Sequence, residues 1–166
     1  MDAAVRALGI AKEAGVKTIL NPAPASNLPN GMLALCDYVT PNETETEILT
    51  GVAVKSAEDA RSAAEILLSK GVGAVVITLG EKGAFLYSAD QSALVPAVNA
   101  GPVVETTGAG DAFNGGFATG LARGDDPVGA VRTGCATAGL AVTRPGTALS
   151  MPESGEVKEL MERNLR

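Results

Sequence analysis

The most informative segment of the sequence is Val103-Val104-Glu105-Thr106-Thr107-Gly108-Ala109-Gly110-Asp111-Ala112-Phe113-Asn114-Gly115-Gly116. Its β-branched beginning predicts an extended strand over 103–107, its small residues predict a turn at 108–110, and a helix should follow. Asp111 falls in the first turn of that helix. A helix N-terminus presents free N–H groups and the positive end of a dipole, which suit a phosphoryl oxygen. A carboxylate beside such groups could accept a proton from a hydroxyl during phosphoryl transfer.

The same stretch also permits a plain structural interpretation. Asp111 can simply favour the N-terminal end of a helix, and the glycines can simply permit a tight turn. The three residues Gly108-Ala109-Gly110 alone favour this plainer interpretation, so the choice depends on the sequence around them.

Helical and extended patterns alternate on both sides of this stretch. Residues 74–78 form a continuous apolar run, which is typical of a buried parallel strand. The alternation predicts one layered α/β domain over residues 1–166. Helices are expected at 2–14, about 29–35, 41–50, about 56–70, from the central stretch to about 121, at about 127–142 and at about 153–163. Strands are expected at 17–20, 37–40, 74–78, 84–87, 94–98 and 103–107.

Composition excludes several classes of protein. The net charge is −6 and no basic cluster occurs, which argues against nucleic acid as a partner. The two cysteines, Cys36 and Cys135, lie far apart in the sequence and there is no histidine, so a Cys/His zinc site is not expected. Two isolated thiols are typical of a protein in a reducing compartment, so a cytoplasmic location is expected. No apolar run approaches the roughly 20 residues of a membrane span. The first residues lack the layout of a signal peptide.

Polar residues at two predicted turns are candidates for a phosphate and metal site. Asn42 and Glu45 stand at positions i and i+3, so both side chains can lie on one face of a helix. Asn42 as a helix cap and Glu45 as a dipole-favouring residue is an equally good interpretation of this pair alone. Thr78 and Gly80 end the buried strand, where parallel sheets collect ligands, and Gly83 permits unusual backbone conformations. No P-loop sequence is present.

Five segments together indicate a family. The run Glu105-Thr-Thr-Gly-Ala-Gly-Asp111 resembles the Asp-Thr-x-Gly-Ala-Gly-Asp signature of the ribokinase-like (pfkB) carbohydrate kinases, with Glu105 in place of the first Asp. Residues 40–45 resemble the Asn-x-x-Glu motif of that family, and 78–83 resemble its nucleotide turn. Residues 20–25 and 141–146 are similar to further segments of these kinases, and all five occur in family order.

The resemblance implies a three-layer α/β/α sandwich with a mostly parallel sheet and ATP-dependent phosphoryl transfer to a primary hydroxyl of a sugar, with ribose favoured by residues 20–25. It implies Asp111 as the catalytic base, Gly108, Ala109 and Gly110 as an anion hole, and Asn42 and Glu45 as residues that organise Mg²⁺ and the triphosphate. Implied nucleotide-site residues are Thr78, Leu79, Gly80, Glu81, Lys82, Gly83 and Cys135. Implied K⁺ positions, several of which would act through backbone carbonyls, are Glu105, Thr107, Ala141, Arg144, Gly146 and Ser150.

The resemblance also implies that something is missing. Members of the family are about twice this long, and their N-terminal half supplies sugar contacts and a small lid sheet. The chain therefore resembles only the C-terminal, nucleotide-binding half. The alternatives are a nucleotide-binding or oligomerising fragment without kinase activity, or a kinase for fructose, a phosphosugar or a nucleoside. A sheet edge exposed by the missing half would favour self-association, so a homo-oligomer is expected.

Overall fold

The computed structural model describes residues 2–164. They gather into two compact units, which are described separately. The first contains the residues up to Leu79 together with Phe85–Leu94, and the second contains Gly80–Ala84 together with the residues from Val95. The chain thus passes between the units at 79/80, 84/85 and 94/95, and neither unit is one continuous segment. The expectation of a single part over 1–166 stays a prediction.

Three strands of the first unit pair in parallel, as predicted. Ile19 of β1 lies opposite Tyr38 of β2, which in turn lies opposite Ala74 of β3. The sheet continues in the order β1-β2-β3-β4-β5. The strands are β1 (Ile19–Leu20), β2 (Tyr38–Val39), β3 (Ala74–Thr78), β4 (Ala84–Ser88) and β5 (Ser92–Val95).

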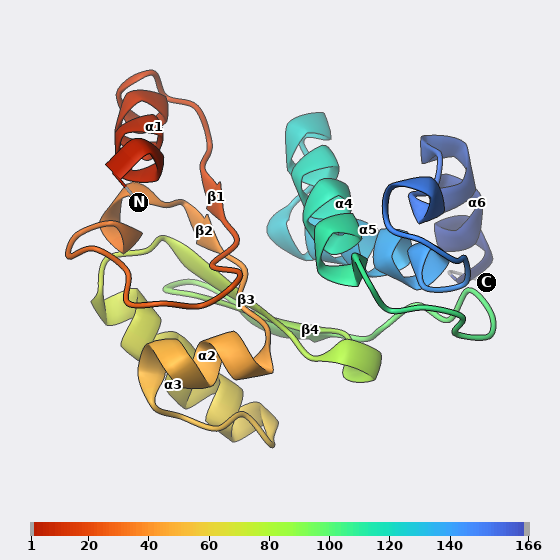
Figure 1. Ribbon diagram of the computed structural model, residues 1–166, viewed down its shortest axis with the longest axis horizontal. Coiled ribbons are helices and arrows are strands. Elements are labelled where there is room, and N and C mark those ends of the chain that lie inside the picture. Colours follow the sequence, from red (N-terminus) through yellow and green to blue (C-terminus); the bar gives the residue numbers. More distant parts are fainter. Residues whose placement is uncertain (1, 165–166) are drawn as a thin grey trace. The chain divides into compact units, whose positions relative to one another are not determined.

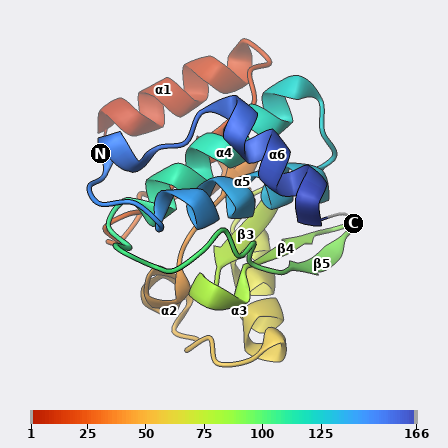
Figure 2. The same cartoon turned by 90° about the vertical axis from the view of Figure 1, so that its right-hand side faces the viewer.

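Helices of the first unit cover both faces of its parallel strands. In the two ribbon views α1 lies on one side of these strands, and α2 and α3 lie on the other (Figure 1, Figure 2). Val75, Val76 and Ile77 of β3 are fully buried, because a strand covered on both faces has no solvent side. The helical segments are α1 (Asp2–Glu13), the 3-10 turn η1 (Leu33–Leu35), α2 (Glu43–Thr50) and α3 (Ala57–Ser69).

Side-chain caps explain where α2 and α3 begin. Asn42 and Glu45 exchange side-chain and backbone hydrogen bonds in a capping box, and Ser56 and Asp59 do the same at α3. The helix expected from about residue 56 is therefore confirmed. Gly51 ends α2 in the left-handed conformation, with a φ of +78°.

Two helices of the second unit approach each other closely through small residues. A Cβ atom on Gly116 of α4 would lie 2.3 Å from Oγ1 of Thr137 on α5, and one on Gly134 of α5 would lie 2.9 Å from the ring of Phe113 on α4. The small residues that fill α5 therefore serve helix packing. The segments of this unit are η2 (Gly80–Lys82), α4 (Ala109–Arg123), α5 (Pro127–Ala141), η3 (Ala148–Ser150) and α6 (Ser154–Asn164).

Gly116→Ala should destabilise the protein, whereas Gly115→Ala should stabilise it. An added methyl group at Gly116 meets Thr137, and overpacking of this kind costs about 1–3 kcal/mol. Gly115 is the preceding residue of the same helix, and a Cβ there meets nothing within 4 Å. Alanine at this position should add up to about 1 kcal/mol from helix propensity. Urea unfolding followed by circular dichroism measures both changes, and shifts of the same sign would contradict the packing described here.

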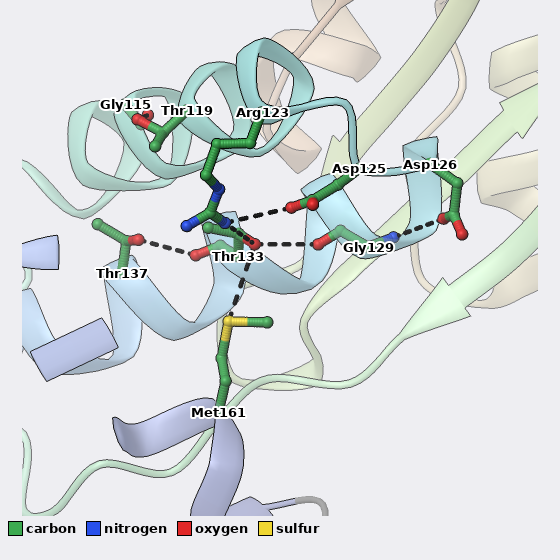
Figure 3. Close-up of polar contacts among 9 residues, drawn as sticks. All are labelled: Gly115, Thr119, Arg123, Asp125, Asp126, Gly129, Thr133, Thr137 and Met161. Atoms are coloured by element: carbon green, nitrogen blue, oxygen red, sulfur yellow. Dashed lines mark hydrogen bonds and ion pairs between the residues drawn. The ribbon is translucent and has the colours of Figure 1, made fainter. Parts of the chain in front are cut away.

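A polar junction at Arg123 connects the three long helices of the second unit (Figure 3). The Arg123 guanidinium at the end of α4 donates to Asp125 Oδ2 at 3.2 Å and to Thr133 Oγ1 on α5 at 3.4 Å. The Thr133 hydroxyl also lies 3.1 Å from the carbonyl of Gly129 and 3.8 Å from Sδ of Met161 on α6. The α4–α5 turn is thus fixed by side chains as well as by its backbone.

The strand expected at 103–107 does not form. This segment leads into α4 without regular strand structure, and its N–H groups at Val104 and Glu105 both donate to the carbonyl of Val142, at 2.8 and 3.2 Å. Because the partner is the end of a helix, no ladder of hydrogen bonds can build up. Val103 and Val104 are 66% and 60% exposed, so their β-branched side chains have no sheet face to cover.

Two further expectations need correction. The helix expected at about 29–35 is reduced to the 3-10 turn Leu33–Leu35, and the strand expected at 94–98 is Ser92–Val95. Pro96 explains the second difference, because proline has no N–H group to continue a strand ladder. Within residues 2–164, no helix is both long and apolar enough to cross a membrane.

Candidate active site

Asn42 and Glu45 form the start of α2, which follows the carboxyl end of β2. Asn42 Oδ1 accepts the N–H of Glu45 at 2.8 Å, and Glu45 Oε2 accepts the N–H of Asn42 at 2.8 Å. Asn42 also lies opposite Thr78 in an isolated parallel bridge. Glu45 is only 8% exposed. The capping interpretation is thus present in the structure, and it holds both side chains at the edge where parallel sheets bind ligands.

The pair fits a magnesium site of the kind that uses few protein ligands. The capping box employs Oε2 of Glu45, and a carboxylate has a second oxygen with its own lone pairs. Mg²⁺ keeps several waters and needs only one or two carboxylates. Among residues 2–164, no group of three or more His, Cys, Asp or Glu side chains could hold a metal ion. One buried carboxylate beside an amide oxygen is therefore compatible with magnesium held largely through water.

The segment 78–83 forms a short, constrained connection after β3. Thr78 ends the strand, Gly80–Lys82 make one 3-10 turn, and the N–H of Gly83 donates to the carbonyl of Gly80 at 3.1 Å. Gly83 has a φ of +99°, and a Cβ there would lie 2.0 Å from the carbonyl oxygen of Val95. Only glycine fits this position, because both the backbone angle and the space exclude a side chain.

The central turn presents unpaired N–H groups at the start of α4. Gly108 is the residue before the helix and has a φ of +80°. The N–H of Ala109 donates to the carbonyl of Thr106 at 3.1 Å. Within residues 2–164, the N–H groups of Gly110 and Asp111 have no protein acceptor. Of the three residues expected to form an anion hole, Gly110 therefore has a free donor in this conformation, whereas that of Ala109 is engaged.

Asp111 occupies the first turn of α4, as the sequence predicts, and its side chain is exposed. It follows the free donor of Gly110 directly. A carboxylate so placed can meet a hydroxyl that approaches an anion held at the helix N-terminus. The geometry of this turn is therefore compatible with the chemistry inferred from the sequence.

Glu105 connects the central turn to the segment after α5. Its Oε2 accepts the N–H of Gly146 at 2.7 Å. The hydrogen bond from Gly146, and then that from the Thr107 hydroxyl, lower the pKa of the Glu105 carboxyl below its ordinary value. Three of the six residues expected at the cation position are thus brought together by hydrogen bonds.

The other three expected cation residues lie along the chain from α5 to η3. Ala141 is the last residue of α5, and its carbonyl accepts the N–H of Arg144 at 3.2 Å. Ser150 is buried, and its hydroxyl donates to the carbonyl of Thr147 at 2.7 Å. The Arg144 side chain turns to α6 and forms a two-point ion pair with Glu156. Carbonyl, hydroxyl and carboxylate oxygens are suitable ligands for K⁺, so the donor set fits that ion.

Glu156→Gln should change how stability depends on pH. Arg144 and the N–H of Glu153 lower the pKa of the Glu156 carboxyl below its ordinary 4.5. A group with a lowered folded pKa contributes stability above its unfolded pKa, and the contribution is lost as the pH falls through the folded value. The difference in Tm between wild type and Glu156→Gln should therefore shrink below about pH 4.5. Glu159→Gln, an exposed change on the same helix, is the control, and a difference that persists in acid would contradict the ion pair.

Cys135 is a buried residue of α5 rather than a reactive one. It is 6% exposed, and burial raises the pKa of its thiol to about 12. Cys36 is also buried, and burial raises the pKa of its thiol to about 11, with a further contribution from Asp37. Neither thiol is a nucleophile at neutral pH. The expectation that Cys135 lies near an adenine stays a prediction.

Sequence reasoning missed Thr147 and Val142. A Cβ on Gly108 would lie 3.3 Å from Cβ of Thr147, and the Val142 carbonyl binds the strand-like segment before the turn. Each lies more than 30 residues along the chain from the residue that it contacts. Neither was expected as a site residue, because the contacts of both depend on the approach of two segments that are distant in sequence.

Comparison with known proteins decides the family. A sequence model described as "pfkB family carbohydrate kinase" matches residues 2–154. The chain belongs to this family. The ribokinase of Haemophilus influenzae is 44% identical over 153 residues, which cover 92% of this chain and 50% of that protein. The deoxyribokinase of Salmonella typhi is 39% identical over 167 residues, which cover 99% of this chain and 54% of that protein.

Solved structures agree with the family assignment. The Arabidopsis thaliana ribokinase complexed with ribose and ATP superposes with a TM-score of 0.92 at 32% identity, over 96% of this chain and 52% of that chain. The predicted ribokinase-like α/β fold is therefore confirmed. The chain spans about half the length of the family members that it matches.

Proposed function

We propose that this member of the pfkB family takes part in ATP-dependent phosphoryl transfer to the primary hydroxyl of a sugar, converting D-ribose to ribose 5-phosphate. The observation that carries the proposal is the position of Asp111, in the first turn of α4 directly after the free N–H group of Gly110. The names of the relatives support the reaction class, and those relatives include both a ribokinase and a deoxyribokinase.

In the proposed reaction, Asp111 accepts the proton of the sugar hydroxyl as that oxygen forms a bond to the γ-phosphorus of ATP. The bond between the γ-phosphorus and the oxygen that bridges it to the β-phosphate breaks, and ADP leaves. N–H groups at the start of α4 stabilise the charge on the phosphoryl oxygens. Gly108, Ala109 and Gly110 supply this turn, and the N–H of Ala109 would join the others if it released the carbonyl of Thr106.

The remaining assignments extend the proposal to nucleotide and ions. Asn42 and Glu45 would hold Mg²⁺ through water, and the segment 78–83 with Cys135 would line the nucleotide site. Magnesium would supply charge neutralisation on the phosphates. The oxygens of Glu105, Thr107 and the residues after α5 would hold K⁺, and the two unpaired cysteines support a reducing, cytoplasmic setting. We also propose that the chain forms a homo-oligomer, because an exposed sheet edge favours self-association.

A second candidate function is nucleotide binding without turnover. It is favoured by the extent of the match, which is about half of each relative. Phosphoryl transfer depends on positioning of both substrates, so a chain that lacked sugar contacts should bind ATP and leave it intact.

Calorimetry with ATP, in the presence and absence of Mg²⁺ and K⁺, tests the proposal together with a coupled assay of ADP release. Magnesium-dependent ATP binding and ribose-dependent ADP release are expected from the kinase. Binding without release would favour the second candidate. Ribose, 2-deoxyribose, fructose and a nucleoside compared at equal concentration would rank the sugars. Absence of ATP binding would refute both functions for this chain.

A further inference from the structure

Two segments of the second unit are held together beside the central turn. The first, 104–108, leads into α4, and the second, 142–147, follows α5. The N–H groups of Val104 and Glu105 donate to the carbonyl of Val142, and Gly108 lies against Thr147, where an added Cβ would be 3.3 Å from the threonine Cβ. The position of the central turn therefore depends on a segment more than 30 residues away.

Within residues 2–164, Glu105 makes the one side-chain hydrogen bond between these two segments. Its Oε2 accepts the N–H of Gly146 at 2.7 Å, and its carboxyl also receives the hydroxyl of Thr107. Thr107 directly precedes Gly108. The carboxylate thus accepts hydrogen bonds from both segments, 104–108 and 142–147. A hydrogen bond to a charged acceptor is about twice as strong as one to a neutral acceptor.

We propose that Glu105 is a positioning residue: by binding the N–H of Gly146 it holds the segment 142–147 against Gly108 and fixes the conformation of the turn that precedes α4. The inference deepens the proposed function, on which it rests where phosphoryl transfer is concerned. It gives the carboxylate a second role, in which one oxygen holds the N–H of Gly146, in addition to the cation contact proposed above.

Two substitutions separate the effect of the length of the Glu105 side chain from the effect of its charge. Glu105→Gln keeps the length of the side chain and a carbonyl oxygen that can accept the N–H of Gly146. Glu105→Asp keeps the charge but shortens the arm by one carbon–carbon bond, about 1.5 Å. A hydrogen bond of 2.7 Å lengthened by that amount is no longer a hydrogen bond. If the length of the side chain is decisive, Glu105→Asp should weaken the contact with Gly146 more. If its charge is decisive, Glu105→Gln should weaken that contact more.

Amide hydrogen exchange in potassium-free buffer tests the proposal without relying on activity. The readouts are Gly146 itself and Ala109 and Ala112, whose N–H groups are hydrogen-bonded at the central turn. Glu105→Asp should speed exchange at all three residues about tenfold or more, because the hydrogen bond is lost. Glu105→Gln should speed exchange by a smaller factor, because its amide oxygen still accepts the N–H of Gly146 in a weaker, neutral bond. Glu159→Asp is the matched control, and unchanged exchange within α5 shows that the fold is intact.

Three results of the exchange experiment in potassium-free buffer would overturn the proposal. These are protection in Glu105→Asp equal to wild type, a greater loss in Glu105→Gln than in Glu105→Asp, and faster exchange at Gly146 without any change at Ala109 and Ala112. Recovery of the Asp variant only on adding K⁺ would likewise assign the carboxylate to the cation. For the sugar-dependent reaction, Glu105→Asp should lower kcat more than Glu105→Gln while the Kd for ATP changes less than kcat. If no turnover exists, the proposed function fails while the exchange data still decide the role of Glu105.

Discussion

Asp111→Asn is expected to lower sugar-dependent ADP release by about 10²- to 10⁴-fold, which is the usual contribution of a general base. Asparagine keeps the size and the hydrogen-bonding oxygen of the side chain but cannot take up a proton at neutral pH. Asp111 is exposed in the first turn of α4, so the substitution leaves the packing of the helix unchanged. The Kd for ATP should change little, because the base acts on the sugar hydroxyl.

The measurement is initial rates at saturating ATP and sugar, together with calorimetric ATP binding on the same preparations. Asp90→Asn, an exposed carboxylate in the turn between β4 and β5, is the matched control and should leave both quantities at wild-type values. A rate reduction in Asp111→Asn below about tenfold would favour the structural interpretation, in which Asp111 only complements the helix dipole.

Gly83→Ala is expected to give the largest loss of stability of any single methyl addition considered for this protein. The built Cβ would lie 2.0 Å from the Val95 carbonyl oxygen, 2.5 Å from the Ala97 nitrogen and 2.6 Å from the Pro96 carbonyl carbon. All three are backbone atoms, which cannot move aside as the end of a flexible side chain can. Overpacking costs about 1–3 kcal/mol, and the positive φ adds about 1–2 kcal/mol, giving about 2–5 kcal/mol in all.

Gly80→Ala provides the matched control for this prediction. Gly80 lies in the same connection and has a φ of +55°, but a Cβ there meets nothing within 4 Å. Gly80→Ala should therefore lower the free energy of unfolding by only about 1–2 kcal/mol, which is the cost of a positive φ for alanine. Urea denaturation followed by far-UV circular dichroism compares the two midpoints. Equal losses for Gly80→Ala and Gly83→Ala would show that the close approach of the 95–97 backbone does not constrain the connection.

The elements that the sequence predicted correctly are those with local causes. The capping box of α3 needs only Ser56 and Asp59, three residues apart, and the burial of β3 follows from its unbroken apolar run. The start of α4 at the central turn follows from Gly108, whose left-handed conformation separates the extended segment from the helix. Each of these features could be predicted because its determinants lie within one short window.

The features that could not be predicted depend on partners distant in sequence. The β-branched residues before Gly108 favour a strand locally, but the available partner is the Val142 carbonyl at the end of α5. The engagement of Ala109 with Thr106 and of Glu105 with Gly146 likewise required the folded backbone. The proposed site was therefore foreseeable as a set of residues, whereas the hydrogen bonds that set their positions were not.

The repeated passage of the chain between the two units has a consequence for its synthesis. The strand order places β4 beside β3 and β5 beside β4, and the first unit includes residues up to Leu94. In a nascent chain that has emerged from the ribosome only as far as β3, one edge of this strand has no partner. Its backbone N–H and C=O groups on that side are unpaired, and its side chains are apolar. The first unit cannot complete its sheet until the following hairpin has left the exit tunnel, so translation pauses before that point should prolong the period in which the nascent chain can aggregate.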